Sequence, residues 1–267
     1  MTLDELNERH ATRFAYAGAY EGGEFGARRV VDEEGRAFVL KWQPPGLAPQ
    51  TTEALRALGY PAPRYVLFGD GYSVQEELPG EPLGGWRIES SPELVELNEL
   101  RQAGRAVAED RTWPAIVVES VVTGGDEYMI LATLESHSPE GRELLALCRA
   151  AVERHAASLT TTGDVVHWDF TGSNVLVTDG RVSGVIDWGG TCSGDRLFDL
   201  ATFLYYARGR APELRAYIVE RIGEEGLSVY LAHMAIRQAE WSVRHHGEGA
   251  GWEMVRYGLE LARAFPA

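Results

Sequence analysis

The sequence predicts an α+β protein with two lobes, a small β-rich N-terminal lobe over residues 1–80 and a larger helical C-terminal lobe over residues 81–267. Three observations support this. Strand patterns separated by glycine turns dominate the first part of the chain, and helical periodicity dominates the second. A polar hairpin interrupts the helical part between residues 167 and 188. At 267 residues the chain can bury a sizeable core.

The N-terminal lobe alternates short strand patterns with turn residues. Lys41 lies near the end of the third strand pattern, just before Pro44-Pro45-Gly46 ends the sheet. The expected elements are a helix over 2–13, three strands within 20–42, a helix over 50–58, two strands over 64–68 and 72–77, and a linker over 78–82.

The C-terminal lobe begins with a helix signal. Ser91-Pro92 and Ser138-Pro139 each place an N-cap residue before a proline at the first helical position, and the first of these helices is expected to reach about residue 109. Residues 113–136 hold β-branched runs that favour strand locally, but their helical setting favours helix, which we predict. The remaining expected helices cover 199–207, 212–222, 227–246 and 252–264.

The hairpin is the most informative stretch. Two β-branched runs flank Asp179-Gly180, a pair typical of a tight turn in which both central residues have positive φ. Such a hairpin returns Asn174 and Asp187 to the same edge, and Asp169 lies in the loop that feeds the first strand. The sequence therefore predicts that two carboxylates and an amide converge.

Charge and composition restrict the partners. The formal net charge of −15 disfavours nucleic acid and permits attraction of a cationic small molecule or protein, although solubility alone also explains it. No apolar run is long enough to span a membrane, the first ten residues lack a secretory h-region, and Cys148 and Cys192 give no disulfide framework. We expect a cytoplasmic protein.

The cations are 24 arginines and one lysine, Lys41, which suggests that this position needs a compact ammonium group. Phosphoryl transfer needs backbone donors and a cation around the phosphates, hard oxygen ligands for a metal and a group that orients the attacking hydroxyl. Singly, each candidate also fits a solvated side chain or an ordinary turn. The candidates are Gly22, Gly23 and Gly26 for the phosphate turn, Lys41 paired with Glu53, Asn174 and Asp187 for metal, and Asp169 for the acceptor hydroxyl.

At these residues the chain resembles the aminoglycoside phosphotransferase family, which has a bilobal protein-kinase-like fold. The family pattern is approximately H-G-D-x-x-x-x-N, a hairpin, I-D-W and then G-D-x-x-x-D-L-A. The matching segments are His167-Trp168-Asp169 with Asn174, Val185 to Trp188, and Gly194 to Ala201, and Leu78-Pro79-Gly80 resembles the hinge exit of the family.

The resemblance implies that Asp169 orients the acceptor hydroxyl, that Asn174 and Asp187 bind Mg²⁺, and that Lys41, with Glu53 behind it, contacts the phosphates of ATP, or of GTP as an alternative. Adenine would meet the backbone of the strand end formed by Gln75, Glu76, Glu77 and Leu78.

Two departures from the family pattern stand out. Trp168 replaces the usual glycine, where it either stacks on substrate or packs under the loop, and the turn at Gly22, Gly23 and Gly26 is not the protein-kinase glycine motif. His167 and Asp199 are expected to support the loop. Asp195 is expected to be structural or to face a cationic substrate, and Glu240 is a further candidate for substrate contact, although a solvated helix face explains it more simply.

The leading hypothesis is a cytoplasmic kinase, monomeric or dimeric, that phosphorylates a hydroxyl of a cationic antibiotic and so confers resistance. The acceptor would be an aminoglycoside or a basic cyclic peptide of the viomycin and capreomycin type. The same fold with choline, homoserine or a sugar as acceptor is the first alternative. A metal hydrolase with His167, Asp169 and Asp187 as ligands leaves Lys41 without a role, and a nucleotide-binding protein without catalysis conflicts with the intact polar set.

Overall fold

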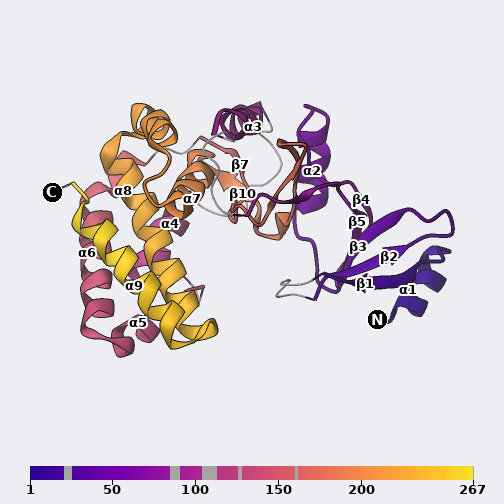
Figure 1. Cartoon of the computed structure of the whole chain (residues 1–267), viewed down its shortest axis with the longest axis horizontal. Coiled ribbons are helices and arrows are strands. Elements are labelled where there is room, and N and C mark those ends of the chain that lie inside the picture. The colour runs from indigo at the N-terminus through magenta and orange to yellow at the C-terminus, as the bar shows by residue number, and fades with distance from the viewer. Residues whose placement is uncertain (21–25, 85–90, 104–112, 126–127, 160–161, 267) are drawn as a thin grey trace. The chain divides into compact units, whose positions relative to one another are not determined.

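The computed structural model describes residues 1–20, 26–84, 91–103, 113–125, 128–159 and 162–266, which form two compact units (Figure 1). Unit 1 comprises Met1–Gly84 with Gly172–Thr191, and unit 2 comprises Gly85–Thr171 with Cys192–Ala267. By its contacts the hairpin therefore groups with the N-terminal segment, whereas the sequence places it in the C-terminal lobe. The lobe boundary after residue 80 stays a prediction, and the mixed strand and helix content confirms the α+β class.

Unit 1 is built on a five-stranded antiparallel sheet in the order β1-β2-β3-β5-β4. Its strands β2 to β5 confirm four of the five strands expected from the turn residues, and Lys41 is the last residue of β3. The first strand was expected within 20–42 and is misplaced, because β1 ends at residue 19. The strands are β1 Ala15–Ala19, β2 Arg28–Val31, β3 Ala37–Lys41, β4 Tyr65–Gly69 and β5 Tyr72–Glu76.

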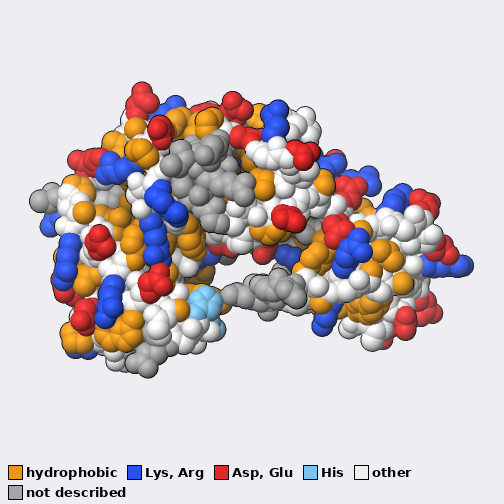
Figure 2. Space-filling model, viewed as in Figure 1, with side chains coloured by type: hydrophobic (Ala, Val, Ile, Leu, Met, Phe, Trp, Pro, Cys, Tyr) orange, Lys and Arg blue, Asp and Glu red, His pale blue; other side chains and the backbone are white. Residues whose placement is uncertain are grey.

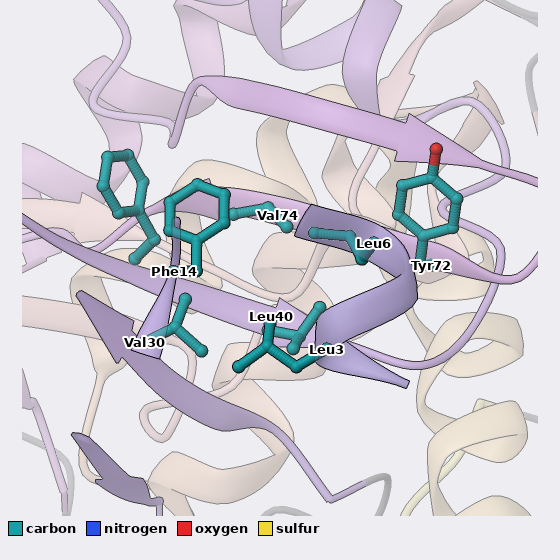
Figure 3. Packing of buried hydrophobic residues seen from close by; sticks show 8 residues of the cluster. Leu3, Leu6, Phe14, Val30, Leu40, Tyr72 and Val74 are labelled. Carbon is teal, nitrogen blue, oxygen red and sulfur yellow. The ribbon is translucent and has the colours of Figure 1, made fainter. Parts of the chain in front are cut away.

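One face of this sheet is covered by α1, Leu3–His10 (Figure 3). Thr2 caps the helix, because its hydroxyl accepts from the amide of Glu5 while the Glu5 carboxylate accepts from the Thr2 amide. Phe38 and Leu40 of β3 lie in the hydrophobic cluster under α1. Successive strand side chains point to opposite faces, so Lys41 belongs to the other face of the sheet. The cluster consists of Leu3, Leu6, Phe14, Val30, Phe38, Leu40, Tyr72 and Val74.

The second sheet of unit 1 has the order β6-β8-β9 and contains the hairpin. Asp179 (φ 52°) and Gly180 (φ 78°) both have positive φ, which confirms the tight turn expected from the Asp-Gly pair. The expected linker contributes β6, which pairs with β8, and the Val185 amide donates to the carbonyl of Pro61. These bonds explain why the hairpin groups with unit 1. The strands are β6 Glu81–Pro82, β8 Val175–Thr178 and β9 Arg181–Val185.

Unit 2 is mainly helical, and α6, α8 and α9 pack together (Figure 1). The Ser138 hydroxyl accepts from the Gly141 amide at 3.0 Å, which confirms it as the N-cap of α6. Gly223, with φ 70° and ψ 172°, kinks α8 between the two helices that the sequence predicts there. The helices are α3 Ser91–Ala103, α4 Ala115–Val122, α5 Leu131–His137, α6 Pro139–His155, α7 Leu197–Ala207, α8 Pro212–His245 and α9 Gly247–Arg263.

The segment at 113–136 is helical, as predicted, in α4 and α5, and the predicted extension of α3 beyond residue 103 lies outside the described residues. Unit 2 also contains a two-stranded sheet that the sequence did not predict, formed by β7, Asp164–Val166, and β10, Cys192–Gly194. Strands of three residues are too short to show a periodic pattern. Gly194 packs against the Trp113 ring, which a Cβ would approach to 2.4 Å.

Within the described residues, no helix combines the length and the apolar character that crossing a membrane requires. On the face shown in Figure 2, acidic and basic side chains are interspersed over both units.

Candidate active site

Unit 1 brings Lys41 and Asp187 together. Lys41 Nζ lies 2.8 Å from Asp187 Oδ1, although the two residues are 146 positions apart in the chain. The lysine side chain is 15% exposed and the aspartate side chain 38% exposed, so the pair is open to solvent on the aspartate side. In such a pair the ammonium group can bind a phosphate, and the carboxylate can bind a metal cation.

Asn174 and Asp187 lie at the open end of the hairpin, as the turn predicts. The Asn174 carbonyl accepts from the Ile186 amide at 2.9 Å, which extends the pairing of β8 and β9 to the residue next to Asp187. Asp187 has left-handed backbone angles, φ 66° and ψ 57°, and precedes a short 3₁₀ turn, Trp188–Gly190. Trp188 anchors this corner, because its indole N–H donates to the Val185 carbonyl at 2.8 Å.

Glu53 does not pair with Lys41, contrary to the sequence-based expectation. It lies on the exposed side of α2, Ala48–Arg56, whose opposite side buries Thr51, Thr52 and Leu55. Asp187 takes the place expected for Glu53 beside the ammonium group. The spacing along α2 decides this, since position 53 faces away from the stripe formed by 51, 52 and 55. The role of Glu53 in nucleotide binding stays a prediction.

The strand end expected to meet adenine is held by side chains that the sequence did not single out. Glu77 accepts from Arg29 Nε at 2.9 Å and from Arg29 Nη2 at 3.0 Å, and it accepts a further hydrogen bond from the Tyr20 hydroxyl. Partial burial acts to raise the pKa of the Glu77 carboxyl, but the hydrogen bonds from Arg29 and Tyr20 outweigh it and leave the pKa below its ordinary value. Gln75 is buried.

The amides of Glu76 and Glu77 donate to the carbonyls of Arg64 and Ala37. These two amides are therefore already engaged within the protein, and a contact of this strand end with adenine stays a prediction. Of the three glycines expected around the phosphates, Gly26 has a positive φ of 64°, and Gly22 and Gly23 lie outside the described residues.

In unit 2 the loop that carries Asp169 is anchored by Asp199 of α7. The Asp199 carboxylate accepts from the amides of His167, at 2.7 Å, and Trp168, at 3.0 Å. It also pairs with the buried guanidinium of Arg101. The Asp169 amide in turn donates to Nδ1 of His167 at 3.3 Å. A buried carboxylate that binds consecutive amides and a cation fixes the backbone of this loop.

Trp168 packs inside unit 2 with 4% of its surface exposed, which corresponds to the packing alternative considered for it. Its ring stacks on Phe198 at 4.9 Å and lies edge-on to His233 at 5.2 Å, and its indole N–H donates to the Tyr128 hydroxyl at 2.9 Å. Its φ of 75° explains why a glycine suits this position, since a left-handed backbone costs an L-residue about 1–2 kcal/mol. A substrate contact for Trp168 stays a prediction.

Asp169 is paired with Arg237 of α8. The guanidinium donates to Asp169 Oδ1 at 2.8 Å and to the Trp168 carbonyl at 2.9 Å. Burial acts to lower the pKa of Arg237. The electrostatic effects of Tyr128 and the Asp169 carboxylate outweigh burial and leave the pKa above its ordinary value, so the side chain stays cationic. No signal in the sequence singles out Arg237, because it belongs to no local motif and is one of 24 arginines.

Asp195 and Glu240 are both buried and paired. Asp195 caps the first turn of α7 by accepting from the Leu197 amide at 2.9 Å, and it accepts from the Tyr230 hydroxyl at 2.7 Å. Burial raises the pKa of the Asp195 carboxyl despite these hydrogen bonds. Glu240 is 1% exposed and pairs with Arg244. These positions favour structural roles, and their contact with substrate stays a prediction.

In the part of the chain that the structure describes, no three His, Cys, Asp or Glu side chains gather as metal ligands. A magnesium site that uses one carboxylate and one amide oxygen does not need such a group, because Mg²⁺ keeps several waters and binds substrate phosphates. Asn174 and Asp187 fit this kind of site by their chemistry and by their place at one end of the hairpin.

The fold and these residues define a kinase-like phosphotransferase, and comparison with known proteins places the chain in a family. The model of the phosphotransferase enzyme family, APH, matches residues 20–233, which is more than half of the chain. The chain therefore belongs to this family, and it is a phosphotransferase that acts on hydroxyl groups of small molecules. No curated protein sequence matches it significantly.

Solved structures share the fold over nearly their whole length. A thermostable mutant of aminoglycoside phosphotransferase APH(4)-Ia, in a ternary complex with ADP and hygromycin B, is 15% identical with a TM-score of 0.76, covering 99% of this chain and 98% of that chain. Choline kinase LicA from Streptococcus pneumoniae is 13% identical, with a TM-score of 0.71 and coverage of 98% and 99%. Amicoumacin kinase hAmiN, in complex with AMP-PNP, Ca²⁺ and Ami, is 11% identical, with a TM-score of 0.68 and coverage of 100% and 95%. These likenesses confirm the protein-kinase-like fold.

Proposed function

We propose that this phosphotransferase moves the γ-phosphate of ATP to a hydroxyl of a cationic antibiotic. The observation that carries the kinase chemistry is the Lys41–Asp187 pair, which joins the one lysine of the chain to the hairpin aspartate. Asp169, on the loop that leads into the same hairpin, supplies the group that faces the acceptor. The antibiotic as acceptor draws support from the net charge of −15 and from the similar structures in complex with hygromycin B and with Ami.

In the proposed reaction the acceptor oxygen attacks the γ-phosphorus, the bond from this phosphorus to the β,γ-bridging oxygen breaks, and ADP leaves. The hydroxyl proton passes to the Asp169 carboxylate and then to solvent. A hydroxyl is too weak an acid to ionise beforehand, so Asp169 acts mainly by orienting it, and the proton moves late. Lys41 neutralises the non-transferred phosphates, which lowers the energy of charge that develops on the leaving group.

Asn174 and Asp187 would hold Mg²⁺. When bound, the ion would supply positive charge that neutralises the nucleotide phosphates. In the structure Asp187 binds Lys41 through Oδ1, and its carboxylate has a second oxygen that would be the one to bind the ion.

The acceptor is the part of the proposal that the site constrains least. Asp195 and Glu240 already bind Tyr230 and Arg244, and this pairing argues against their direct contact with ammonium groups of an antibiotic. The negative charge of the whole surface then contributes long-range attraction. Choline, homoserine or a sugar remains the alternative acceptor class, and GTP the alternative donor.

The test is ADP release and ³²P transfer from γ-labelled ATP to a panel of hygromycin B, viomycin, capreomycin, amicoumacin, choline and homoserine. Asp169→Asn serves as the inactive variant, and Asp70→Asn, on the exposed β4–β5 turn, as the matched control. Transfer to an antibiotic that is lost only in Asp169→Asn supports the proposal. Transfer to choline or homoserine alone assigns the metabolite class, and transfer to none rules out the antibiotic acceptors tested.

A further inference from the structure

The backbone at Trp168 is held in a conformation that disfavours its own side chain. With φ at 75° it lies in the left-handed region, although Trp168 is a large L-residue. Such a residue persists only where its surroundings fix it, and strain of this kind gathers at functional sites. The residue that follows is Asp169, so anything that fixes Trp168 also directs the proposed acceptor-facing carboxylate.

Besides Arg237, several residues of unit 2 restrain Trp168. Asp199 binds its amide, Tyr128 accepts from its indole N–H, and Phe198 stacks on its ring. These contacts hold the amide and the side chain of Trp168. The Trp168 carbonyl, which belongs to the peptide that leads to Asp169, binds another residue.

Arg237 supplies the restraint on that carbonyl and continues it to the carboxylate. Nη1 donates to the Trp168 carbonyl at 2.9 Å, and Nη2 donates to Asp169 Oδ1 at 2.8 Å. The two acceptors belong to consecutive residues, so the planar guanidinium bridges the peptide and the side chain in one geometry. Between Asp164 and Asp179 the chain has no lysine or arginine, so helix α8 supplies this cation from 68 residues away.

We propose that Arg237 is a positioning residue for phosphoryl transfer: its bidentate contact holds the strained Trp168 backbone and the Asp169 carboxylate in the geometry that orients the acceptor hydroxyl. This inference rests on the proposed function. It predicts that loss of Arg237 affects the turnover step more than nucleotide binding, because the nucleotide groups Lys41 and Asp187 lie in the other unit.

The kinetic test uses the acceptor from the panel that the wild-type protein phosphorylates, with Mg-ATP as donor. Arg237→Gln is expected to lower kcat about 100-fold and to leave the KM for ATP within about 2-fold. Arg237→Lys keeps the charge but cannot bind both acceptors in a fork, so it should recover only part of kcat. The matched control is Arg215→Gln, which removes an exposed arginine of the same helix that pairs with Glu224, and it should leave kcat unchanged.

A double-mutant cycle separates positioning from general packing. Trp168→Gly relieves the left-handed strain, so Arg237→Gln should lower kcat by only about 10-fold in this background. Full additivity of the two effects, or wild-type kcat in Arg237→Gln, would overturn the proposal.

Trp168→Gly also empties a buried volume and can fail to fold, so a second measurement covers this outcome. In protein labelled with 5-fluorotryptophan, the ¹⁹F resonance of Trp168, assigned with Trp168→Phe, should shift or broaden in Arg237→Gln and not in Arg215→Gln. An unchanged resonance would show that Arg237 does not hold this residue. If the wild-type protein phosphorylates no acceptor, the proposed function fails, and the resonance still decides whether Arg237 fixes the loop.

Discussion

Lys41 Nζ and Asp187 Oδ1 are 2.8 Å apart, so the lysine at the end of β3 pairs directly with the hairpin aspartate. Each of these groups has a separate task in the proposed reaction, the first on the phosphates and the second on Mg²⁺. In the structure the ammonium group and the carboxylate neutralise each other. This pairing lowers the cost of holding both charges in one partly buried site when no nucleotide is bound. In the proposed reaction Mg-ATP would bring a phosphate to Lys41 and a metal ion to Asp187.

We expect Lys41→Met to lower kcat/KM for ATP by at least about 100-fold, because it removes a preorganised cation from the phosphates. Lys41→Arg should also be strongly impaired, since a planar guanidinium does not replace a compact ammonium group. Steady-state kinetics at varied ATP concentration measure both effects. Arg36→Gln, which alters a cation 65% exposed in the β2–β3 turn, is the control, and wild-type kcat/KM in Lys41→Met would refute the role of Lys41.

Mg-ATP should raise the melting temperature of the wild-type protein, because a ligand that binds only the folded state stabilises it by about 2.7 kcal/mol at 100 times its Kd. Asn174→Ala and Asp187→Asn should each reduce this shift, since each removes one oxygen ligand. Differential scanning fluorimetry with Mg-ATP, Mg²⁺ alone and ATP with EDTA tests the prediction. A full shift with Mg²⁺ alone would favour the metal-hydrolase alternative.

The Glu77 network should stabilise the protein at neutral pH and weaken in acid. The folded-state pKa of Glu77 is depressed, so its contribution is present above the unfolded pKa of about 4.3 and is lost as the pH falls through the folded value. The difference in unfolding free energy between wild type and Glu77→Gln should therefore shrink below about pH 4.3. Urea unfolding at pH 7, 5, 4 and 3.5 measures it, with exposed Glu33→Gln as the control. A difference that stays constant with pH would contradict the prediction.

His233 should also make the fold sensitive to acid, because its folded state disfavours the protonated, charged form of the side chain. Burial, together with the positive charge of Arg237, lowers the pKa of this histidine to about 3. The unfolded state therefore takes up a proton below about pH 6.5 that the folded state refuses, and stability falls as the pH decreases toward 3.

His233→Phe should remove this proton uptake and flatten the loss of stability between pH 6 and 4 by up to about 1.4 kcal/mol per pH unit. Chemical denaturation at each pH gives the slopes, and His246→Gln, at an exposed position after α8, is the control. If wild type and His233→Phe lose stability in parallel, His233 does not control the acid response.

The hairpin and β3 were predictable because their signals are local. The Asp179-Gly180 pair sets the turn, and the pairing that follows carries Asn174 and Asp187 to one end. The alternation of partly buried and buried residues in β3 similarly fixes the face on which Lys41 lies. Resemblance in the motif from His167 to Ala201 then indicated the family, which the match over residues 20–233 confirms.

Partner choice was less predictable, since it depends on which faces of distant elements meet. Glu53 has the charge to pair with Lys41 but lies on the wrong side of α2, and Asp187 binds the lysine instead. Arg29 and Tyr20, which hold Glu77, are marked by no motif. The substrate candidates Asp195 and Glu240 are polar in sequence but buried and paired in the fold.

The sequence by itself therefore determined the fold class, the hairpin, and the residue types that carry phosphoryl transfer, because turn chemistry and strand alternation act between neighbours in the chain. Only the tertiary structure decided that Lys41 pairs with Asp187, that Trp168 is packed in a left-handed conformation, and that Arg237 of α8 binds Asp169. The two pairs join residues 146 and 68 positions apart in the chain, and packing of whole elements selects them.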